Sequence, residues 1–169
     1  MPGKQSKASK KNNKPSSLPV NRPLAVNRQA RFNYEISETI EAGLVLTGTE
    51  IKSIRQGNVD IRDAYAQPLD GELWLQNVHI KPYEQGNIRN HEPRRPRKLL
   101  LHRSQILHFS SLVSEKRNTL IPLRIYIKGR VAKVLMGLGK GKRQYEKRRT
   151  LINRAIDRDT EREMKSIRY

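Results

Sequence analysis

The chain has 169 residues, of which 35 are Lys or Arg and 16 are Asp or Glu, so the formal net charge is +19. Hydrophobic residues make up only 35% and cysteine is absent, which excludes a disulfide framework, a zinc–thiolate site and a thiolate nucleophile. No run approaches the roughly 18 apolar residues of a membrane span, and the N-terminus lacks the apolar run of a secretory signal, so we expect a soluble, cytoplasmic protein.

The excess positive charge lies mainly in the two ends of the chain. Residues 1–31 contain eight Lys/Arg and no acidic residue, and residues 137–169 contain eleven Lys/Arg against five acidic residues. Charge clustered in this way indicates a polyanionic partner. Neither end offers the aromatic-rich apolar face of an interfacial helix, so a membrane surface suits this chain less well than a nucleic acid.

Composition divides the chain into three parts. Residues 1–26 are rich in Lys, Ser, Asn and Pro and cannot bury enough apolar area to order themselves, so we predict a disordered basic arm. Residues 27–139 have the alternating apolar pattern of a compact domain, and residues 140–169 form a basic tail. The arm could add nonspecific affinity for RNA by releasing counterions.

The first half of the middle part predicts strands, one short helix and a hairpin. Phe32, Tyr34 and Ile36 alternate with polar residues as in a half-buried strand, which continues through 44–46. Residues 48–56 predict a short helix that ends at Gly57. The segments 64–66 and 73–75 flank Asp70-Gly71, a dipeptide typical of a hairpin turn.

The second half of the middle part predicts a helix and another hairpin. Ile106, Phe109 and Val113 have helical spacing, and Ser104 is a suitable N-cap. The alternating segments 123–127 and 131–136 flank Lys128-Gly129. Several short strands with two to three helices predict a mainly β fold, a small closed barrel of the oligonucleotide-binding type. Such barrels bind nucleic acid on one face, through a charged groove and exposed aromatic side chains.

The stretch GLGKGKRQYEKRR, residues 137–149, combines glycines with lysines and suggests a grip on phosphate. It is neither a Walker loop, because Arg143 replaces the required Ser or Thr, nor a dinucleotide fingerprint, because Lys142 replaces the last glycine. We interpret it as a flexible glycine hinge that leads into a cationic run. The run 94–98, RRPRK, is either a solvated loop or a phosphate clamp.

Catalytic patterns are weak. The four histidines, His79, His91, His102 and His108, include no pair at i, i+4, and no G-x-S-x-G elbow occurs. We therefore expect no enzyme activity, no metal and no cofactor.

The tail has a thin apolar stripe. Ile152, Ile156, Met164 and Ile167 share one helical face, and the other faces are almost fully charged. Because so thin a stripe gives little packing energy, we predict a tail that is disordered alone and helical on a partner. Docking of the tail on its own barrel is the equally open alternative.

Taken in order, several segments resemble the SsrA-binding protein family, also called small protein B. They are NRQARFNYEI from Asn27, EAGLVLTGTEIKSIRQG from Glu41, RDAY from Arg62, RPRKLLLHRSQI from Arg95, KRNTLIPLRIYIKGRVAKVLMGLGKGKRQYEKR from Lys116, and RDTEREM from Arg158. The resemblance implies an oligonucleotide-binding-like barrel that binds the tRNA-like part of transfer-messenger RNA. It also implies rescue of stalled bacterial ribosomes by trans-translation, with elongation factor Tu engaged through the RNA and one monomer bound per RNA.

The resemblance also implies site residues. The RNA-gripping positions fall on Asn27, Glu41, Leu100 and Lys133, and Arg28, Lys140 and Lys142 are placed beside the RNA backbone. Because a carboxylate repels phosphate, we expect Glu41 to bond a base amine, a 2′-hydroxyl or an orienting arginine. The positions implied for the decoding centre and the empty message channel of the ribosome are Tyr145, Glu146, Lys147, Arg148, Arg158 and Arg162. Glu146 and Tyr145 stand where relatives commonly have Asp and, in some cases, His.

Two other functions share the charge and the arms. One is that of a structural ribosomal protein or a general RNA-binding barrel protein, and the other is that of an RNA-processing enzyme. The enzyme needs a catalytic cluster, and the ribosomal protein would stay on salt-washed ribosomal subunits, whereas a rescue factor would be lost from them.

Overall fold

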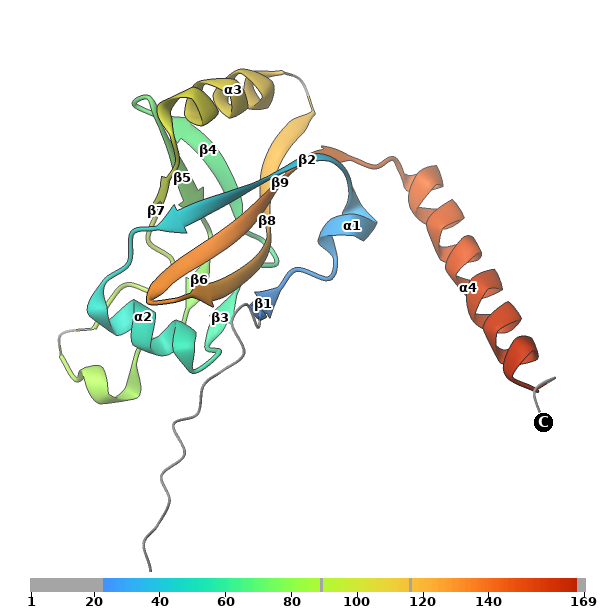
Figure 1. Ribbon diagram of the computed structural model, residues 1–169, viewed down its shortest axis with the longest axis horizontal. Coiled ribbons are helices and arrows are strands. Elements are labelled where there is room, and N and C mark those ends of the chain that lie inside the picture. The colour runs from blue at the N-terminus through green and yellow to red at the C-terminus, as the bar shows by residue number, and fades with distance from the viewer. Residues whose placement is uncertain (1–22, 89, 116, 167–169) are drawn as a thin grey trace, which may run out of the picture.

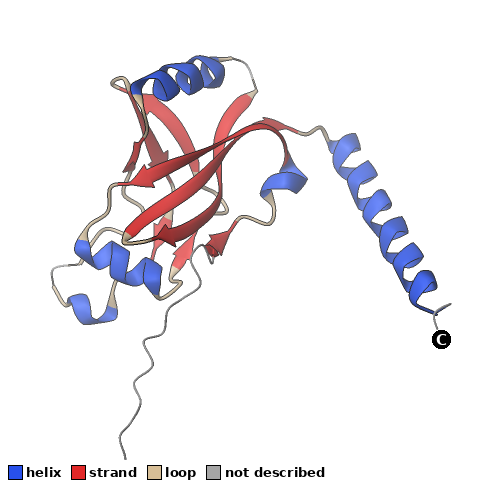
Figure 2. Cartoon of the chain, viewed as in Figure 1, coloured by secondary structure: helices blue, strands red, loops and turns tan. Residues whose placement is uncertain are grey.

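A computed structural model describes residues 23–88, 90–115 and 117–166, so the predicted disorder of the first arm falls mostly outside the described residues. The fold is mainly β, as expected (Figures 1 and 2). The elements are β1 (Pro23–Val26), α1 (Ala30–Asn33), β2 (Tyr34–Leu44), α2 (Gly48–Arg55), β3 (Val59–Asp60), β4 (Tyr65–Leu69), β5 (Glu72–Gln76), β6 (His79–Ile80), the 3-10 turn η1 (Glu84–Gly86), β7 (Arg97–Leu100), α3 (Arg103–Ser114), β8 (Asn118–Lys128), β9 (Val131–Gly141) and α4 (Gln144–Ser166).

Six antiparallel strands close into a ring. The hydrogen-bonded order runs β8–β4–β5–β7–β2–β9, and β9 pairs again with β8. The three long strands β2, β8 and β9 have 11 residues each, and β9 is paired along its length with both of the others. Strand β1 is added outside the ring on β8, and β3 and β6 form a separate two-stranded sheet. The closure confirms the expected closed sheet and leaves β2, β9 and β8 as one continuous outer face.

The interior of the ring is filled by alternate residues of its strands. On β9 the inward side chains are Ala132, Val134, Met136 and Leu138, all buried. Phe109 of α3 joins the same core, which places this helix over one end of the ring (Figure 1). Three α-helices, α1 to α3, accompany the ring within the described residues, which agrees with the expected two to three.

Most predicted elements are present, with three local differences. Phe32 lies in α1 and not in a strand, because Asn27 starts a helical turn there by accepting a hydrogen bond from the Ala30 amide at 3.0 Å. Val45 and Leu46 follow the end of β2. Helix α3 is preceded by His102, whose amide donates to Gln105 Oε1 at 3.1 Å, so Ser104 lies inside the helix and is not its cap.

The glycines of the 137–141 stretch are not a hinge. They belong to β9, where Gly139 is paired with Ile36 on one side and Thr119 on the other. A Cβ atom built on Gly139 would lie 3.0 Å from Tyr34 Cβ and 3.3 Å from Ile121 Cδ1, whereas one built on Gly141 meets nothing within 4 Å. Glycine is required at position 139 because apolar side chains cover the outer surface of β9 there.

This difference predicts unequal effects of two alanine substitutions. Gly139→Ala should destabilise the fold by about 1–3 kcal/mol, because the new methyl group collides with a Cβ close to the backbone. Gly141→Ala, one alternate position further along the same strand, should change stability by less than about 0.5 kcal/mol. Urea unfolding of both variants measures this. Equal urea midpoints for the two variants would mean that Tyr34 and Ile121 move aside and accommodate the new methyl group at position 139 without loss of stability.

Helix α4 extends away from the ring (Figure 1). Its first turn is closed by Glu146, whose Oε2 accepts a hydrogen bond from the Arg143 amide at 2.7 Å, and its main contact with the rest of the chain is with α1. The exposed fractions of Ile152, Ile156 and Met164 are 59%, 57% and 65%, and Ile167 lies outside the described residues. The tail is helical without packing its apolar stripe, so disorder of the free tail in solution stays a prediction.

The division into residues 1–26, 27–139 and 140–169 also stays a prediction, although β1 pairs with β8 and β9 runs on to Gly141. None of the helices in the described ranges is both long enough and apolar enough to cross a membrane.

Candidate nucleic-acid interface

Three strands place charged and aromatic side chains side by side on the outer face of the ring. In the register of β8, β9 and β2, Leu135 lies between Arg124 and Glu41, and Lys133 lies beside Tyr126. Because side chains alternate along a strand, residues 124 and 126 of β8 share this face with 133 and 135 of β9. The ring thus brings together residues that are far apart in the sequence.

Glu41 is the centre of this face. Its carboxylate accepts a hydrogen bond from the Tyr126 hydroxyl and lies 3.6 Å from Lys133 Nζ and 3.7 Å from Lys128 Nζ. The expected partner of Glu41 was a base, a ribose or an arginine. Within the chain, the carboxylate bonds Tyr126, and both lysine ammonium groups lie near its Oε1; its contact with RNA stays a prediction.

The protonation of this group follows from its contacts. The hydrogen bond from Tyr126, opposed by burial and aided by Lys128 and Lys133, lowers the pKa of Glu41 from its ordinary value. Burial, together with the bond to Glu41, raises the pKa of Tyr126 to about 12. At neutral pH the hydroxyl is therefore a donor and the carboxylate is ionised, and the network carries one net positive charge.

Leu100 borders the same network. Its side chain is half exposed and lines a hollow together with Glu41, Lys133, Leu101, His102 and Gln105. Gly43 of β2 makes room for it, because a Cβ atom there would lie 3.2 Å from Leu100 Cβ. Three of the predicted RNA-gripping residues, Glu41, Leu100 and Lys133, therefore line one hollow.

Asn27 lies elsewhere and is engaged inside the protein. Its side chain is buried, and Nδ2 donates to the carbonyls of Ile61 at 3.4 Å and Arg62 at 3.3 Å. Asn27 nevertheless lines a hollow with the exposed Arg28, so its contact with RNA stays a prediction.

Lys140 lies near the other end of β9, about 23 Å along the strand from Lys133 at roughly 3.3 Å per residue, and Lys142 directly follows the strand. They line a third hollow with Glu35, Arg117, Arg143 and Glu146. Lys142 is fixed to α1, because its amide donates to Asn33 O at 2.9 Å and its Nζ to Arg31 O at 3.1 Å. This hollow marks the point where the ring passes into α4.

The predicted tail residues follow on α4. Tyr145 is 64% exposed and Arg148 is exposed, whereas Lys147 and Glu146 are half buried. Glu146 caps the helix through the Arg143 amide, which gives its carboxylate a role inside the chain. Arg162 is exposed and pairs with Asp159 at 3.3 Å. Arg158 lies on α4, and its side chain is outside the description.

The arginine run 94–98 is not a phosphate clamp as a whole. Arg97 is fully buried and Arg95 is partly buried, and both guanidinium groups bond the buried carboxylate of Glu50. Lys98 pairs with Glu72. Only Arg94 of the run's basic residues remains exposed without a partner among the described residues.

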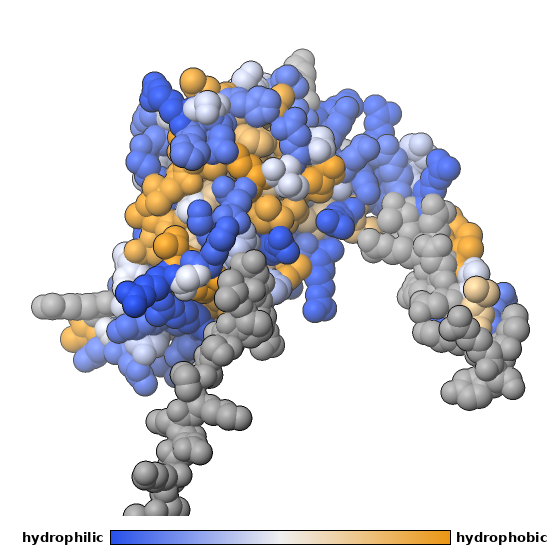
Figure 3. Space-filling view, viewed as in Figure 1, coloured by the Kyte–Doolittle hydropathy of each residue, from blue (hydrophilic) through white to orange (hydrophobic). Residues whose placement is uncertain are grey.

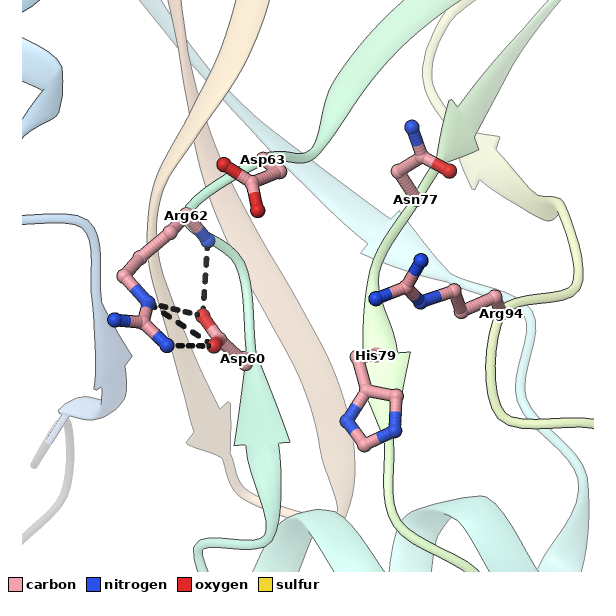
Figure 4. Close-up of a pocket in the computed structure, with 6 residues that line it drawn as sticks. All are labelled: Asp60, Arg62, Asp63, Asn77, His79 and Arg94. Carbon is pink, nitrogen blue, oxygen red and sulfur yellow. Dashed lines mark hydrogen bonds and ion pairs between the residues drawn. The ribbon is translucent and has the colours of Figure 1, made fainter.

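Arg94 borders a hollow of a different character, shown in Figure 4. Arg62 is bound to Asp60 there with an ion pair of 2.6 Å, and Asp63 faces the same space with Asn77 and His79 (Figure 4). Two carboxylates beside two arginines make this hollow a poor phosphate site. In the described part of the chain, no three His, Cys, Asp or Glu side chains are placed to share a metal ion.

Sequence reasoning missed Tyr126 and Arg124 as members of the interface. The signal was the alternation of residues 124, 126 and 128 along one strand, which places an arginine, a tyrosine and a lysine on one face. What the alternation could not give is the partner strand, because the pairing of Tyr126 with Glu41 spans 85 residues.

Comparison with known proteins identifies the family. The family model described as SmpB protein matches residues 24–166. The SsrA-binding protein of Enterococcus faecalis is 54% identical over 148 residues, covering 86% of this chain and 94% of that protein. The SsrA-binding protein of Ligilactobacillus salivarius is 50% identical over 150 residues, covering 89% of this chain and 97% of its own length.

A solved structure described as "tmRNA-SmpB: a journey to the center of the bacterial ribosome" is also similar. Its matching chain is 52% identical with a TM-score of 0.63, and the match covers 76% of this chain and 90% of that one. The family model spans nearly the whole described chain, and the curated relatives align over more than nine-tenths of their own length. This chain therefore belongs to the SmpB family of SsrA-binding proteins.

Proposed function

We propose that this chain binds the tRNA-like domain of transfer-messenger RNA and delivers it to stalled ribosomes for trans-translation. The observation that carries the proposal is the outer face of β2, β9 and β8, where Glu41 holds Lys128 and Lys133 beside Leu100. Membership of the SmpB family supports it. Action on ribosomes implies a cytoplasmic location.

The geometry suits an RNA backbone bordered by exposed bases. Two ammonium groups near one carboxylate oxygen present positive charge to phosphates, while Leu100 offers an apolar surface to a base or ribose. Glu41 then acts mainly by placing the lysines. Lys140 and Lys142 would meet the backbone further along β9, where the tail begins.

In this proposal α4 acts on the ribosome. Its residues Tyr145, Glu146, Lys147, Arg148, Arg158 and Arg162 are assigned to the decoding centre and the empty message channel, and elongation factor Tu is engaged through the RNA. The extension of α4 away from the ring leaves its faces open for such a partner (Figure 1). We assign no catalytic step and no cofactor to the chain, and one monomer is expected per RNA.

The first experiment is to purify the tagged full-length protein from its own cells under a moderate-salt wash and to sequence the bound RNA. One enriched species with a tRNA-like end and an internal reading frame is the expected result. Ribosomal RNA in stoichiometric amount, surviving the wash, would instead support a structural ribosomal protein and overturn the proposal.

The role of Glu41 predicts coupling with Tyr126. Glu41→Gln and Tyr126→Phe should each weaken binding of the tRNA-like domain, because each loosens the two lysines. The double variant should bind about as weakly as the weaker single variant, since both changes disrupt one network. Filter binding at fixed salt measures the three dissociation constants. If the losses of binding free energy in the two single variants add up in the double variant, Glu41 contacts the RNA independently of Tyr126.

A further inference from the structure

The hairpin of β4 and β5 presents an apolar and aromatic surface on the outside of the ring. Leu73 and Leu75 of β5 are buried, so Trp74 between them points outward, as do Tyr65 and Leu69 of β4. The exposed fractions are 38% for Tyr65 and 48% for Leu69, and Trp74 is half buried. Figure 3 shows apolar side chains at the left edge of the ring, where β5 and β7 lie in Figure 1. We call the surface formed by Tyr65, Leu69 and Trp74 the hairpin face.

Strand register places Trp74 at the centre of the hairpin face. It lies opposite Gln67 of β4 on one side and Lys98 of β7 on the other. Tyr65 and Leu69 lie two residues to either side of Gln67, so they flank Trp74 along β4. Tryptophan and tyrosine are enriched at the centres of protein–protein interfaces, and a patch of this kind on a ring surface is typical of a binding site for another protein.

The charge of the hairpin face differs from that of the rest of the chain. Residues 63–80 contain three acidic residues, Asp63, Asp70 and Glu72, and no Lys or Arg, in a chain whose formal net charge is +19. Lys98, which borders the face on β7, pairs with Glu72, so its charge is balanced. Because acidic groups repel phosphate, this face does not continue the RNA interface.

The chemistry of the hairpin face selects among its possible occupants. A second copy of this chain fits poorly, because two chains of net charge +19 repel each other. Residues 1–22 of the same chain are basic, but they contain no aromatic residue and little apolar surface. A protein segment that combines apolar side chains with Lys or Arg complements both the aromatic centre of the face and its acidic turn.

We propose that the hairpin face binds a basic segment of a partner protein through that segment's apolar side chains. Trp74 and Leu69 cover the apolar side chains, and Asp70, at the turn of the hairpin, attracts the cations. The proposal goes beyond RNA binding, because it gives the ring a protein partner on a separate face. On β7, Lys98 borders the hairpin face and Leu100 borders the RNA interface, so the two partners lie side by side on the ring.

The test uses the fluorescence of the full-length protein, because Trp74 is the only tryptophan of the chain and lies at the centre of the face. The probe is a decapeptide of alternating lysine and valine, which should shift the emission of Trp74 to shorter wavelength in a saturable manner as the indole leaves water. A decapeptide of alternating glutamate and valine, and a six-nucleotide oligouridylate, should leave the emission unchanged. No response to the lysine–valine peptide, or an equal response to either control, would overturn the proposal.

The emission of the protein without peptide distinguishes the other occupants. It should stay constant as the protein is concentrated and as salt is added. A shift to shorter wavelength on concentration would show that a second copy covers the face. A shift to longer wavelength on addition of salt would show that the chain's own basic arm leaves it. Either shift would overturn the proposal.

Substitutions on the hairpin face give an independent readout. Leu69→Ser should weaken binding of the lysine–valine peptide about fivefold at every salt concentration, because it removes apolar area. Asp70→Asn should weaken it about twofold and only at low salt. Asparagine tolerates the φ angle of 51° at this position, so the turn is kept. The matched control is Ile88→Ser, at an apolar residue that is 94% exposed outside the face. Equal losses in Ile88→Ser and Leu69→Ser would mean that the peptide binds any apolar surface, and would contradict the proposal.

The two proposals fail in different ways. If transfer-messenger RNA is recovered from cells but Trp74 does not respond to the lysine–valine peptide, the hairpin face is not a binding site and the rescue function stands. If Trp74 responds while cells yield no such RNA, the hairpin face binds a basic protein segment and the rescue function falls.

Discussion

Removal of residues 143–169 should abolish tagging of stalled peptides while preserving binding of transfer-messenger RNA. The ring is complete without this segment, because β9 ends at Gly141 and Lys142 keeps its bond to Asn33. Helix α4 contacts mainly α1, and its apolar side chains Ile152, Ile156 and Met164 are exposed. Removal of the helix therefore costs the fold little packing. The loss of tail cations should weaken RNA binding by less than about tenfold, and this difference should shrink as salt rises.

Two assays on the same protein measure the prediction: filter binding of the tRNA-like domain, and tagging of a peptide stalled on a message without a stop codon. The reciprocal variant, Lys133→Ala, keeps the whole tail and should lose RNA affinity. If truncation lowers RNA affinity as much as it lowers tagging, the ring and the tail do not divide the work as proposed.

Turn residues and short-range periodicity in the sequence were enough to predict several of the helices and hairpins. The helix from Gly48, the hairpin at Asp70-Gly71 and the hairpin at Gly129 all depend on turn residues and short-range periodicity, and all are present. At Asp70 and Gly71 the φ angles are 51° and 73°, the left-handed conformation that this dipeptide adopts readily. The mainly β class followed from the same signals.

The interface could be predicted only in part, because its geometry depends on contacts between distant segments. The resemblance supplied Glu41, Leu100 and Lys133, and the fold brings them together. Sequence pattern alone could not show that Asn27 turns inward, nor that β9 needs Gly139 for packing. An arginine run looks the same whether it meets solvent, phosphate or a buried carboxylate, and Glu50 lies 47 residues before Arg97.

Arg97→Met should destabilise the fold by about 3–5 kcal/mol, the usual cost of removing one partner from a buried ion pair. Arg97 is fully buried, and its guanidinium donates to Glu50 at 2.9 Å and to the carbonyls of Val78 at 2.8 Å, Arg95 at 2.9 Å and Pro93 at 3.0 Å. Methionine fills much of the volume but removes the guanidinium donor from the Val78 and Arg95 carbonyls, while the Pro93 carbonyl still accepts from the Ile80 amide at 3.1 Å. The same segment carries Arg94 and leads into Leu100, so its loss also disturbs the edge of the interface.

The matched control is Arg95→Met, which removes the same chemistry from the same carboxylate at a site where the side chain is 28% exposed. Water can replace part of that bond, so the loss should be closer to about 1 kcal/mol. Urea unfolding at pH 7 compares the two variants. Similar losses of unfolding free energy in the two variants would mean that burial of the arginine does not determine how much its ion pair with Glu50 contributes to stability.

The same cluster predicts how stability depends on pH. Burial favours the neutral form of Glu50, but the hydrogen bonds from Arg95 and the Thr47 amide and the charge of Arg97 outweigh it and lower the pKa of Glu50 from its ordinary value of 4.5. Since the folded pKa lies below the unfolded one, the unfolded chain binds the proton more readily. The contribution of Glu50 is therefore complete above about pH 5 and is lost as the pH falls through the folded pKa.

Glu50→Gln isolates this effect, because glutamine cannot take up the proton. The difference in unfolding free energy between the unsubstituted protein and Glu50→Gln should be largest above pH 5 and should narrow steadily below pH 4.5. The pKa values of Glu41 and Asp60 are lowered as well, but their contributions are present in both proteins and cancel in the difference. A difference that stays constant from pH 7 to pH 3 would mean that the pKa of Glu50 is the same in the folded and the unfolded chain, and would contradict the prediction.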